Sequence, residues 1–171
     1  KDIAMQVIGN MYDHLEVAKN KTVNIVVATS GDTGSAAIAA LNNRKNINLL
    51  ELYHGPTLAF KDIAMQVIGN MYDYLEVAKN KTVNIVVATS GDTGAAAINA
   101  IKGKKDVNIF VLHPNNRISP VQRKLMTTGK EKNVYNIAVE GSFDDCQNLV
   151  KAMFTDKIFA KEIKMSGVNS I

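Results

Sequence analysis

The sequence predicts an α/β fold, a doubly wound parallel sheet in three layers with helices on both faces. From residue 47 onward, strand-like and helix-like segments alternate, which is typical of parallel strands joined by right-handed crossovers. The run at 83–88 is nearly continuous in β-branched residues and suits a strand that is covered on both faces. Two distinctive motifs, at 54–61 and 89–94, each follow a predicted strand, and such sheets bind ligands beyond the carboxyl ends of their strands.

The predicted series begins with a strand at 47–52 and a helix at 62–79. Apolar side chains recur in this helix at a spacing of three to four residues, which predicts its buried face: Ala64, Val67, Ile68, Met71, Leu75 and Ala78. Asn80 can adopt the left-handed conformation that ends a helix. The strand at 83–88 then leads into a glycine-containing turn and an alanine-rich helix that reaches about Lys102.

The second half of the chain continues the alternation with predicted strands at 107–113 and 134–139. Between them, Ser119 as the N-cap and Pro120 in the first turn predict a short helix that stops at Gly129. Ser142, with Asp145 three residues later, resembles a capping box and predicts a helix from Phe143 to about Phe159.

Residues 1–41 are repeated at 61–101, with 37 of the 41 pairs identical. Only the second copy follows the lead-in at 54–60. Solenoids usually hold at least about three repeats, so we interpret this pattern as a duplication, natural or engineered, of part of one domain. We expect residues 1–46 to be a partial duplicate of 61–106, and residues 47–171 to form a small α/β domain.

The duplicated strand, Val23 to Thr29, is expected to join the edge of the main sheet in a monomer. The alternative is that the two copies compete for one place in the fold, which would favour a domain-swapped dimer.

The composition is that of an ordinary globular chain, with 171 residues, 46% hydrophobic residues, 21% charged residues and a net charge of +4. No apolar run approaches the roughly 18 residues of a membrane span and no signal peptide is evident, so we expect a cytoplasmic protein without a membrane partner. The basic clusters lack interleaved aromatic residues and do not indicate nucleic-acid binding. Cys146 is the single cysteine and predicts a small buried hydrophobe rather than a disulfide or a metal ligand.

The segment Ser90-Gly91-Asp92-Thr93-Gly94 lies between a predicted strand and a predicted helix. Its glycines permit a close backbone approach, and the first amides of the helix lack intrahelical partners, so the segment could bind a carboxylate or a phosphate. Alternatively, Ser90 or Asp92 merely caps the helix, and the spacing does not decide between the two. The segment is neither a Walker loop nor a dinucleotide-binding motif, and Asp92 is an unfavourable neighbour for an anion.

Lys61 stands at the start of a helix beside the expected ligand edge. A lysine there can be an ordinary solvated first-turn residue. If it packs against Phe60 and Tyr53, desolvation would favour the neutral amine that a covalent catalyst needs. We expect His54 to hold the turn at Gly55-Pro56 rather than to act in acid–base chemistry. No histidine pairs with an acid at metal-ligand spacing, so no metal is expected.

The stretch at 50–62, Leu-Glu-Leu-Tyr-His-Gly-Pro-Thr-Leu-Ala-Phe-Lys-Asp, closely resembles the signature of the threonine synthase family. The spacing to 89–94 fits that family, and so do the runs at 112–114, 119–122 and 139–147. The resemblance extends over residues 47–171, with 1–41 as a second partial copy. It implies the fold-type II class of enzymes that use pyridoxal 5'-phosphate (PLP), and 47–171 would be the smaller domain of such an enzyme.

The resemblance implies that Lys61 holds PLP and shuttles protons at the α and β carbons of the substrate. The loop residues Ser90, Gly91, Asp92, Thr93 and Gly94 would bind the substrate carboxylate, and Asp92 and Thr93 would also face the cofactor. The implied reaction converts O-phospho-L-homoserine and water to L-threonine and phosphate, with PLP as the electron sink. Asp92 stands where relatives of this fold often carry asparagine.

The larger domain of the family normally supplies a second glycine-rich loop for the PLP phosphate, and no such loop is visible in this sequence. Asn169-Ser170-Ile171 resembles the start of the segment that leads back into that domain. We therefore expect the chain by itself to be inactive, and the first copy, with Lys1 and Ser30–Gly34, to be unused. The alternatives are a non-catalytic α/β module that binds phosphate or carboxylate, an engineered duplication, or another phospho-lyase of the same family.

Overall fold

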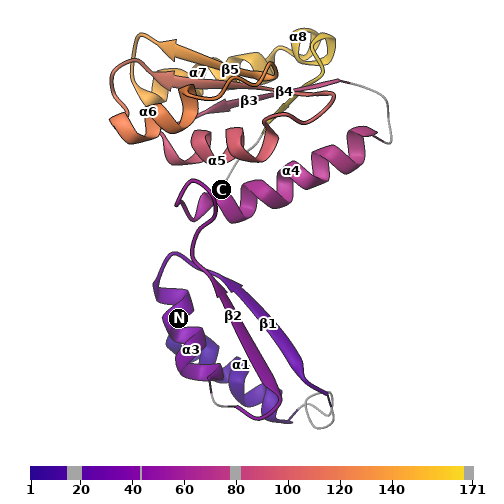
Figure 1. Ribbon diagram of the computed structural model, residues 1–171, viewed down its shortest axis with the longest axis vertical. Coiled ribbons are helices and arrows are strands. Elements are labelled where there is room, and N and C mark those ends of the chain that lie inside the picture. Colours follow the sequence, from indigo (N-terminus) through magenta and orange to yellow (C-terminus); the bar gives the residue numbers. More distant parts are fainter. Residues whose placement is uncertain (15–20, 43, 78–81, 168–171) are drawn as a thin grey trace. The chain divides into compact units, whose positions relative to one another are not determined.

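The computed structural model describes residues 1–14, 21–42, 44–77 and 82–167 and divides into two compact units (Figure 1). We call them the N-terminal unit, Lys1–His54, and the C-terminal unit, Gly55–Ile171. The sequence placed this boundary between residues 46 and 47. The predicted helix end at Asn80 and the segment Asn169–Ile171 lie outside the described residues. No helix in the described ranges is both long and apolar enough to cross a membrane.

The C-terminal unit contains a parallel four-stranded sheet with the order β5-β4-β3-β6. Its strands are β3 (Val83–Ala88), β4 (Val107–Pro114), β5 (Val134–Val139) and β6 (Met165–Gly167). The first three confirm the predicted strands. The three-residue β6 was missed, because so short a segment shows no recognisable period.

Helices cover both faces of this sheet, which confirms the three-layer prediction (Figure 1). They are α4 (Lys61–Val77), α5 (Asp92–Ile101), α6 (Pro120–Thr127), α7 (Phe143–Thr155) and α8 (Lys157–Glu162). Successive residues of β3 point to opposite faces. Ile85 and Val87 pack in one core with α4, α5 and α6, whereas Val86 packs with Cys146 of α7. Cys146 is fully buried, as predicted, and burial raises the pKa of its thiol.

Two predictions about helices were wrong in part. The expected helix from Phe143 to Phe159 is divided at Asp156, whose carboxylate caps α8 by accepting the amides of Ile158 and Phe159. The predicted buried stripe of α4 includes Val67 and Met71, yet these side chains are 58% and 56% exposed.

The buried face of α4 instead carries Met65 and Gly69. A Cβ at Gly69 would lie 2.7 Å from the carbonyl oxygen of Ala100, so this glycine lets α4 cross α5 closely. The close crossing determines which face of α4 is buried, and a count of apolar residues cannot reveal it because glycine contributes no side chain.

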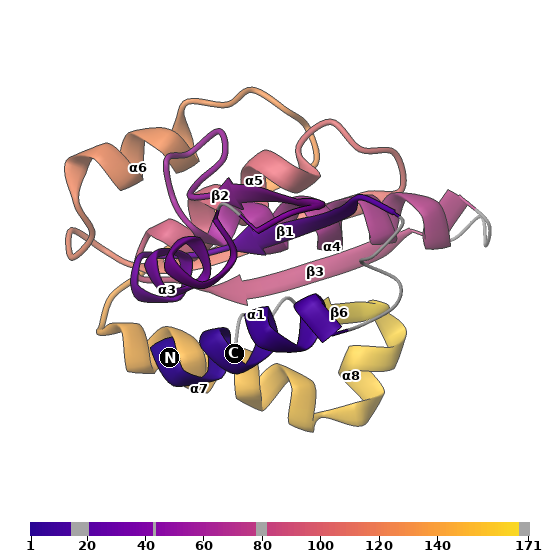
Figure 2. The ribbon, with the colours of Figure 1, turned by 90° about the horizontal axis from the view of Figure 1, so that it is seen from below.

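The N-terminal unit contains α1 (Asp2–His14), β1 (Val23–Ala28), α3 (Asp32–Leu41) and β2 (Ile47–Leu52). Its two strands lie side by side and pair in parallel (Figures 1 and 2). We expected β1 to join the main sheet and β2 to begin it, and the structure shows neither pairing among the described strands. The register explains why: β1 meets β2 with Val23 opposite Ile47, as β3 meets β4 with Val83 opposite Val107. β1 therefore pairs with β2 in the same way that β3 pairs with β4.

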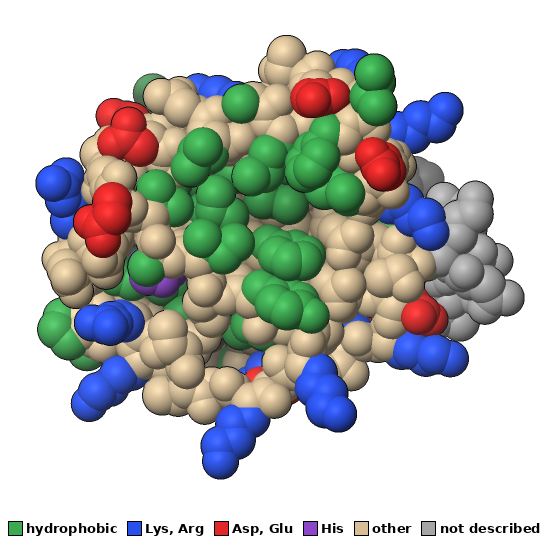
Figure 3. All heavy atoms as spheres, turned by 90° about the horizontal axis from the view of Figure 1, so that it is seen from above, with side chains coloured by type: hydrophobic (Ala, Val, Ile, Leu, Met, Phe, Trp, Pro, Cys, Tyr) green, Lys and Arg blue, Asp and Glu red, His purple; other side chains and the backbone are tan. Residues whose placement is uncertain are grey.

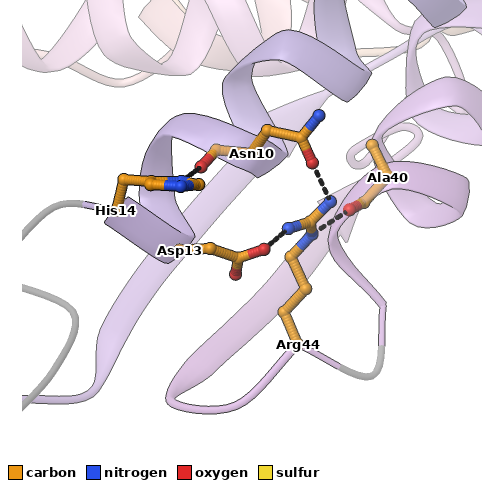
Figure 4. Close-up of polar contacts among 5 residues, drawn as sticks. All are labelled: Asn10, Asp13, His14, Ala40 and Arg44. Atoms are coloured by element: carbon orange, nitrogen blue, oxygen red, sulfur yellow. Dashed lines mark hydrogen bonds and ion pairs between the residues drawn. The ribbon is translucent and has the colours of Figure 1, made fainter.

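A matching ion pair lies beside the helices in each unit. In the N-terminal unit, Arg44 pairs with Asp13 of α1 and donates from Nε to the carbonyl oxygen of Ala40 at 2.5 Å (Figure 4). At the corresponding positions of the C-terminal unit, Lys104 Nζ lies 3.3 Å from Asp73 Oδ2 of α4. The duplicated block therefore forms the same type of helix pair twice, with arginine in one and lysine in the other.

Candidate functional site

The loop at 55–60 is folded around the carboxylate of Asp62, the second residue of α4. Asp62 is fully buried. Its Oδ2 accepts the amides of Gly55 at 3.2 Å, Thr57 at 2.9 Å and Ala59 at 3.2 Å. Its Oδ1 accepts the hydroxyl of Thr57 at 2.7 Å. Four donors on one buried carboxylate make Asp62 the anchor of this loop.

The anchored loop restricts the backbone of Lys61, because Lys61 lies in the sequence between the loop and Asp62. A Cβ at Gly55 would lie 2.7 Å from the Cβ of Asp62, so only glycine fits there. Leu58 has a φ of +60°, which is uncommon for a residue with a side chain. Lys61 is the first residue of α4 and is half-buried. Sequence reasoning missed Asp62, although an acid in the first turn after Gly-Pro-Thr is a recognisable capping signal.

The expected aromatic neighbours of Lys61 are in different situations. Phe60 directly precedes it in the anchored loop. Tyr53 belongs to the N-terminal unit, where its hydroxyl donates to Glu51 Oε2 at 2.6 Å, and this hydrogen bond raises the pKa of Tyr53. A contact between Tyr53 and Lys61 stays a prediction, as does the role of His54 in the turn.

The glycine-rich loop after β3 is organised by Thr89, whose side chain is buried. Its hydroxyl oxygen accepts the amides of Gly91 at 2.9 Å and Gly94 at 2.8 Å. Gly91 has a φ of +142°, a conformation that favours glycine. The sequence offered Ser90 or Asp92 as the cap of the following helix. The N-cap residue of α5 is instead Gly91, which has no side chain, and Thr89 accepts the local amides.

Asp92 is bound to α6 by a hydrogen bond from Gln122 Nε2 to its Oδ1 at 2.7 Å. The same Gln122 closes the capping box of α6 with Ser119. Gln122 also lies so close to Gly91 that a Cβ there would collide with its amide group. The carboxylate of Asp92 is therefore engaged by a donor from α6, which gives a physical account of an acid beside an expected anion site.

Two amides at the start of α5 remain suited to an anion. Asp92 and Thr93 open the helix, and the hydrogen bonds of the described residues give their amides no acceptor. Ser90 is exposed beside them. This end of α5 can therefore hold a carboxylate or a phosphate with two amides and one hydroxyl.

Lys61 and the glycine-rich loop lie toward the same edge of the sheet. β3 follows α4 and leads into α5, so both helices run opposite to β3 and begin near its carboxyl end (Figure 1). The two helices pack along each other, with Gln66 of α4 donating to Asn99 of α5 at 3.3 Å. This edge of the α/β unit thus carries Lys61 and a helix end whose first amides can bind an anion.

A parallel three-layer α/β unit with these two features at one edge corresponds to the smaller domain of a fold-type II enzyme. The chain is 39% identical to threonine synthase of Eremothecium gossypii over 184 aligned residues, covering all of this chain and 36% of that protein. It is 48% identical to threonine synthase of Pseudomonas aeruginosa over 148 residues, covering 86% of this chain and 32% of that protein. No family model matches the sequence.

A PLP-bound threonine synthase from Brucella melitensis has a similar structure, with a TM-score of 0.67 and 54% identity over 70% of this chain and 26% of that one. The chain thus spans about a third of the length of the curated relatives it matches. Over the region that it shares with these enzymes, the chain belongs to the threonine synthase family.

Proposed function

We propose that the C-terminal unit supplies the cofactor-binding lysine and the carboxylate-binding loop of a threonine synthase, which forms L-threonine and phosphate from O-phospho-L-homoserine and water. The observation that supports this most is the anchored loop, because Asp62 holds Lys61 at the edge where the Ser90–Gly94 loop also lies. When bound, PLP supplies the electron sink for this chemistry.

The residues of this unit fit the proposed cofactor. Lys61 offers a primary amine for covalent attachment on a rigid helix start, and the same amine can carry a proton between the α and β carbons of the substrate. The amides of Asp92 and Thr93, with the hydroxyl of Ser90, can hold the substrate carboxylate and orient those carbons. Gly91 and Gly94 leave room for the backbone to approach the ligand.

We assign this role to the second copy only. Thr29 makes the same contacts as Thr89, with its hydroxyl oxygen 3.0 Å from the Gly31 amide and 2.8 Å from the Gly34 amide. Lys1, however, is exposed where Lys61 is half-buried. The proposal includes a cytoplasmic location, where a lone thiol such as Cys146 stays reduced.

Reductive labelling tests the proposal. The full chain is incubated with PLP, reduced with borohydride, and the labelled peptide is mapped. We expect one label on Lys61 and none on Lys1, loss of the label in Lys61→Ala, and retention in the matched Lys1→Ala. Labelling spread equally over exposed lysines would contradict the proposal and favour a module that only binds anions at Ser90–Gly94.

A second measurement separates cofactor binding from turnover. We expect the chain loaded with PLP, but not reduced, to release no phosphate from O-phospho-L-homoserine by itself. Phosphate release that disappears in Lys61→Ala would show that this expectation is wrong, while leaving the assignment of Lys61 intact.

A further inference from the structure

The outer strand of the C-terminal sheet, β5, presents an unprotected edge. Among the described strands, β5 pairs only with β4. Edge strands in soluble proteins usually carry charges, proline or bulges that prevent further pairing. Residues 134–139 contain neither a charged residue nor a proline. We propose that a second copy of this chain pairs with this edge, antiparallel and about a two-fold axis, and extends the sheet across a homodimer.

The backbone determines which residues can pair. The amide of Ile109 donates to the carbonyl oxygen of Asn133, and the amide of Asn115 donates to that of Val139. The odd-numbered residues of β5 therefore bond to β4, and the even-numbered residues, 134 to 138, direct their backbone groups to the free edge. Two identical edges can then pair with Asn136 opposite Asn136 of the second copy, which gives an isologous interface.

This register brings apolar side chains together on one face of the extended sheet. Tyr135 and Ile137 are 45% and 41% exposed although they belong to a sheet. The ring of Tyr135 stacks on Phe110 with centroids 4.6 Å apart, which fixes its position on the face that carries α7. Apolar side chains gather on this face (Figure 3). Tyr135 would lie opposite Ile137 of the second copy, twice in the dimer, and aromatic–β-branched pairs of this kind stabilise antiparallel sheets.

The charges beside β5 favour the same register. Lys132 precedes the strand and Glu140 follows it, and both are exposed. Lys132 lies in the turn before β5 and Glu140 directly follows β5, so an antiparallel pair centred on Asn136 brings Lys132 of each copy near Glu140 of the other. Asn115 donates to Glu140 Oε1 at 2.6 Å and helps to orient it. Charge complementarity therefore selects a second copy of this chain as the occupant of the edge.

The expectation of a monomer rested on β1 joining this sheet. Because β1 pairs with β2 instead, that argument no longer applies. The inference is independent of the proposed enzymatic function, since it uses neither Lys61 nor the glycine-rich loop.

Sedimentation equilibrium of the full chain at rising concentration tests the dimer. We expect the mass of a dimer at high concentration. Ile137→Lys places a cation opposite Tyr135 at both contacts and should raise the dissociation constant at least about tenfold. Lys132→Glu is expected to weaken the dimer by about threefold to tenfold, and adding Glu140→Lys in the same chain to restore it. The matched control Val67→Lys, at an exposed site on α4, should leave the dimer unchanged.

Three results would overturn the proposal. The first is a monomer at all concentrations up to about 1 mM. The second is a dimer that tolerates Ile137→Lys but is lost in Val26→Lys, which would move the contact to the exposed face of β1. The third is a charge-reversed double variant that stays as weak as Lys132→Glu. Circular dichroism of each variant checks that the chain is folded, which is expected because all five substituted side chains are exposed.

Discussion

The two copies of the duplicated block form the same local structure but differ in burial. Thr29 and Thr89 accept the same pair of amides in the loops that follow β1 and β3. Gly9 meets the carbonyl oxygen of Ala40 as Gly69 meets that of Ala100. Hydrogen bonds and helix crossings inside the block are therefore properties of its own sequence, and they form wherever the block occurs.

Burial depends on the elements that pack against the block from outside. Ile98 is 4% exposed, whereas its counterpart Ile38 is 38% exposed. In the described structure α5 packs extensively against α4, α6 and β4, and α3 against α1, β1 and β2, so only α5 has a second helical neighbour. Val86 of β3 is covered by α7, whereas Val26 of β1 is 60% exposed. Only in the C-terminal unit, therefore, are the described apolar residues of the block buried by helices from outside it, α6 and α7.

The largest difference between the copies should appear when the matched isoleucines are shortened. Ile98→Ala leaves a cavity in the core of the C-terminal unit and should cost about 2–5 kcal/mol of its unfolding free energy. Ile38→Ala removes a partly solvated side chain and should cost about 1–2 kcal/mol. Hydrogen exchange measures each unit separately. Equal losses in both units would show that the deeper burial of Ile98 adds nothing to the stability of the C-terminal unit.

The next largest effect is expected at the matched acids in the first turns of α4 and α1. Asp62→Ala leaves the loop amides of residues 55–59 without their acceptor and should destabilise the C-terminal unit by about 2–3 kcal/mol. Asp2 is exposed, so Asp2→Ala should change stability by less than about 0.5 kcal/mol. Denaturant unfolding followed by hydrogen exchange measures both. Asp62 would not be the anchor if the protection of Thr57 and Ala59 were retained in the variant.

A smaller and equal effect is expected at the two threonines that organise the glycine-rich loops. Thr89→Val and Thr29→Val each remove the acceptor of two amides and keep the shape of the side chain, so each should cost about 1–3 kcal/mol in its own unit. The measurement is the same as for the acids. A loss confined to Thr89→Val would refute the conclusion that the two loops are locally equivalent.

The smallest effect concerns α7, which has no counterpart in the N-terminal unit. Asp145 accepts the amide of Ser142 at 2.7 Å and its hydroxyl at 2.8 Å, and these hydrogen bonds lower the pKa of Asp145. A carboxylate with a lowered pKa stabilises the fold above its unfolded pKa of about 4, and this contribution is lost as the pH falls through the folded value. The protection of the amides at the start of α7, measured against their intrinsic exchange rate at each pH, should therefore fall in that acidic range. Asp145→Asn should remove the pH dependence, whereas no change in the variant would exclude this cap as its cause.

Much of the fold was predictable because its signals are local. The strands at 83–88 and 134–139 are continuous β-branched or alternating runs, and the capping residues Ser119 and Ser142 mark their helices. Two parts of the candidate site, Lys61 and the Ser90–Gly94 loop, were proposed from the sequence and stay predictions. The roles of Asp62 and Thr89 were missed although their partners are near in the sequence. The role of Gln122 could not be predicted, because α6 brings it to Asp92 from a distant part of the chain.

The helices, strands, helix crossings and turn hydrogen bonds of both copies follow from the repeated sequence, since the groups that form them lie within the same block. Packing from outside the block determines which copy has a complete core and which strand β1 pairs with. The difference between Lys61 and Lys1, by contrast, was expected from the lead-in at 54–60. Identical residues have different burial in the two units because hydrophobic burial is a property of the neighbours that a segment acquires, and those neighbours lie outside the repeated sequence.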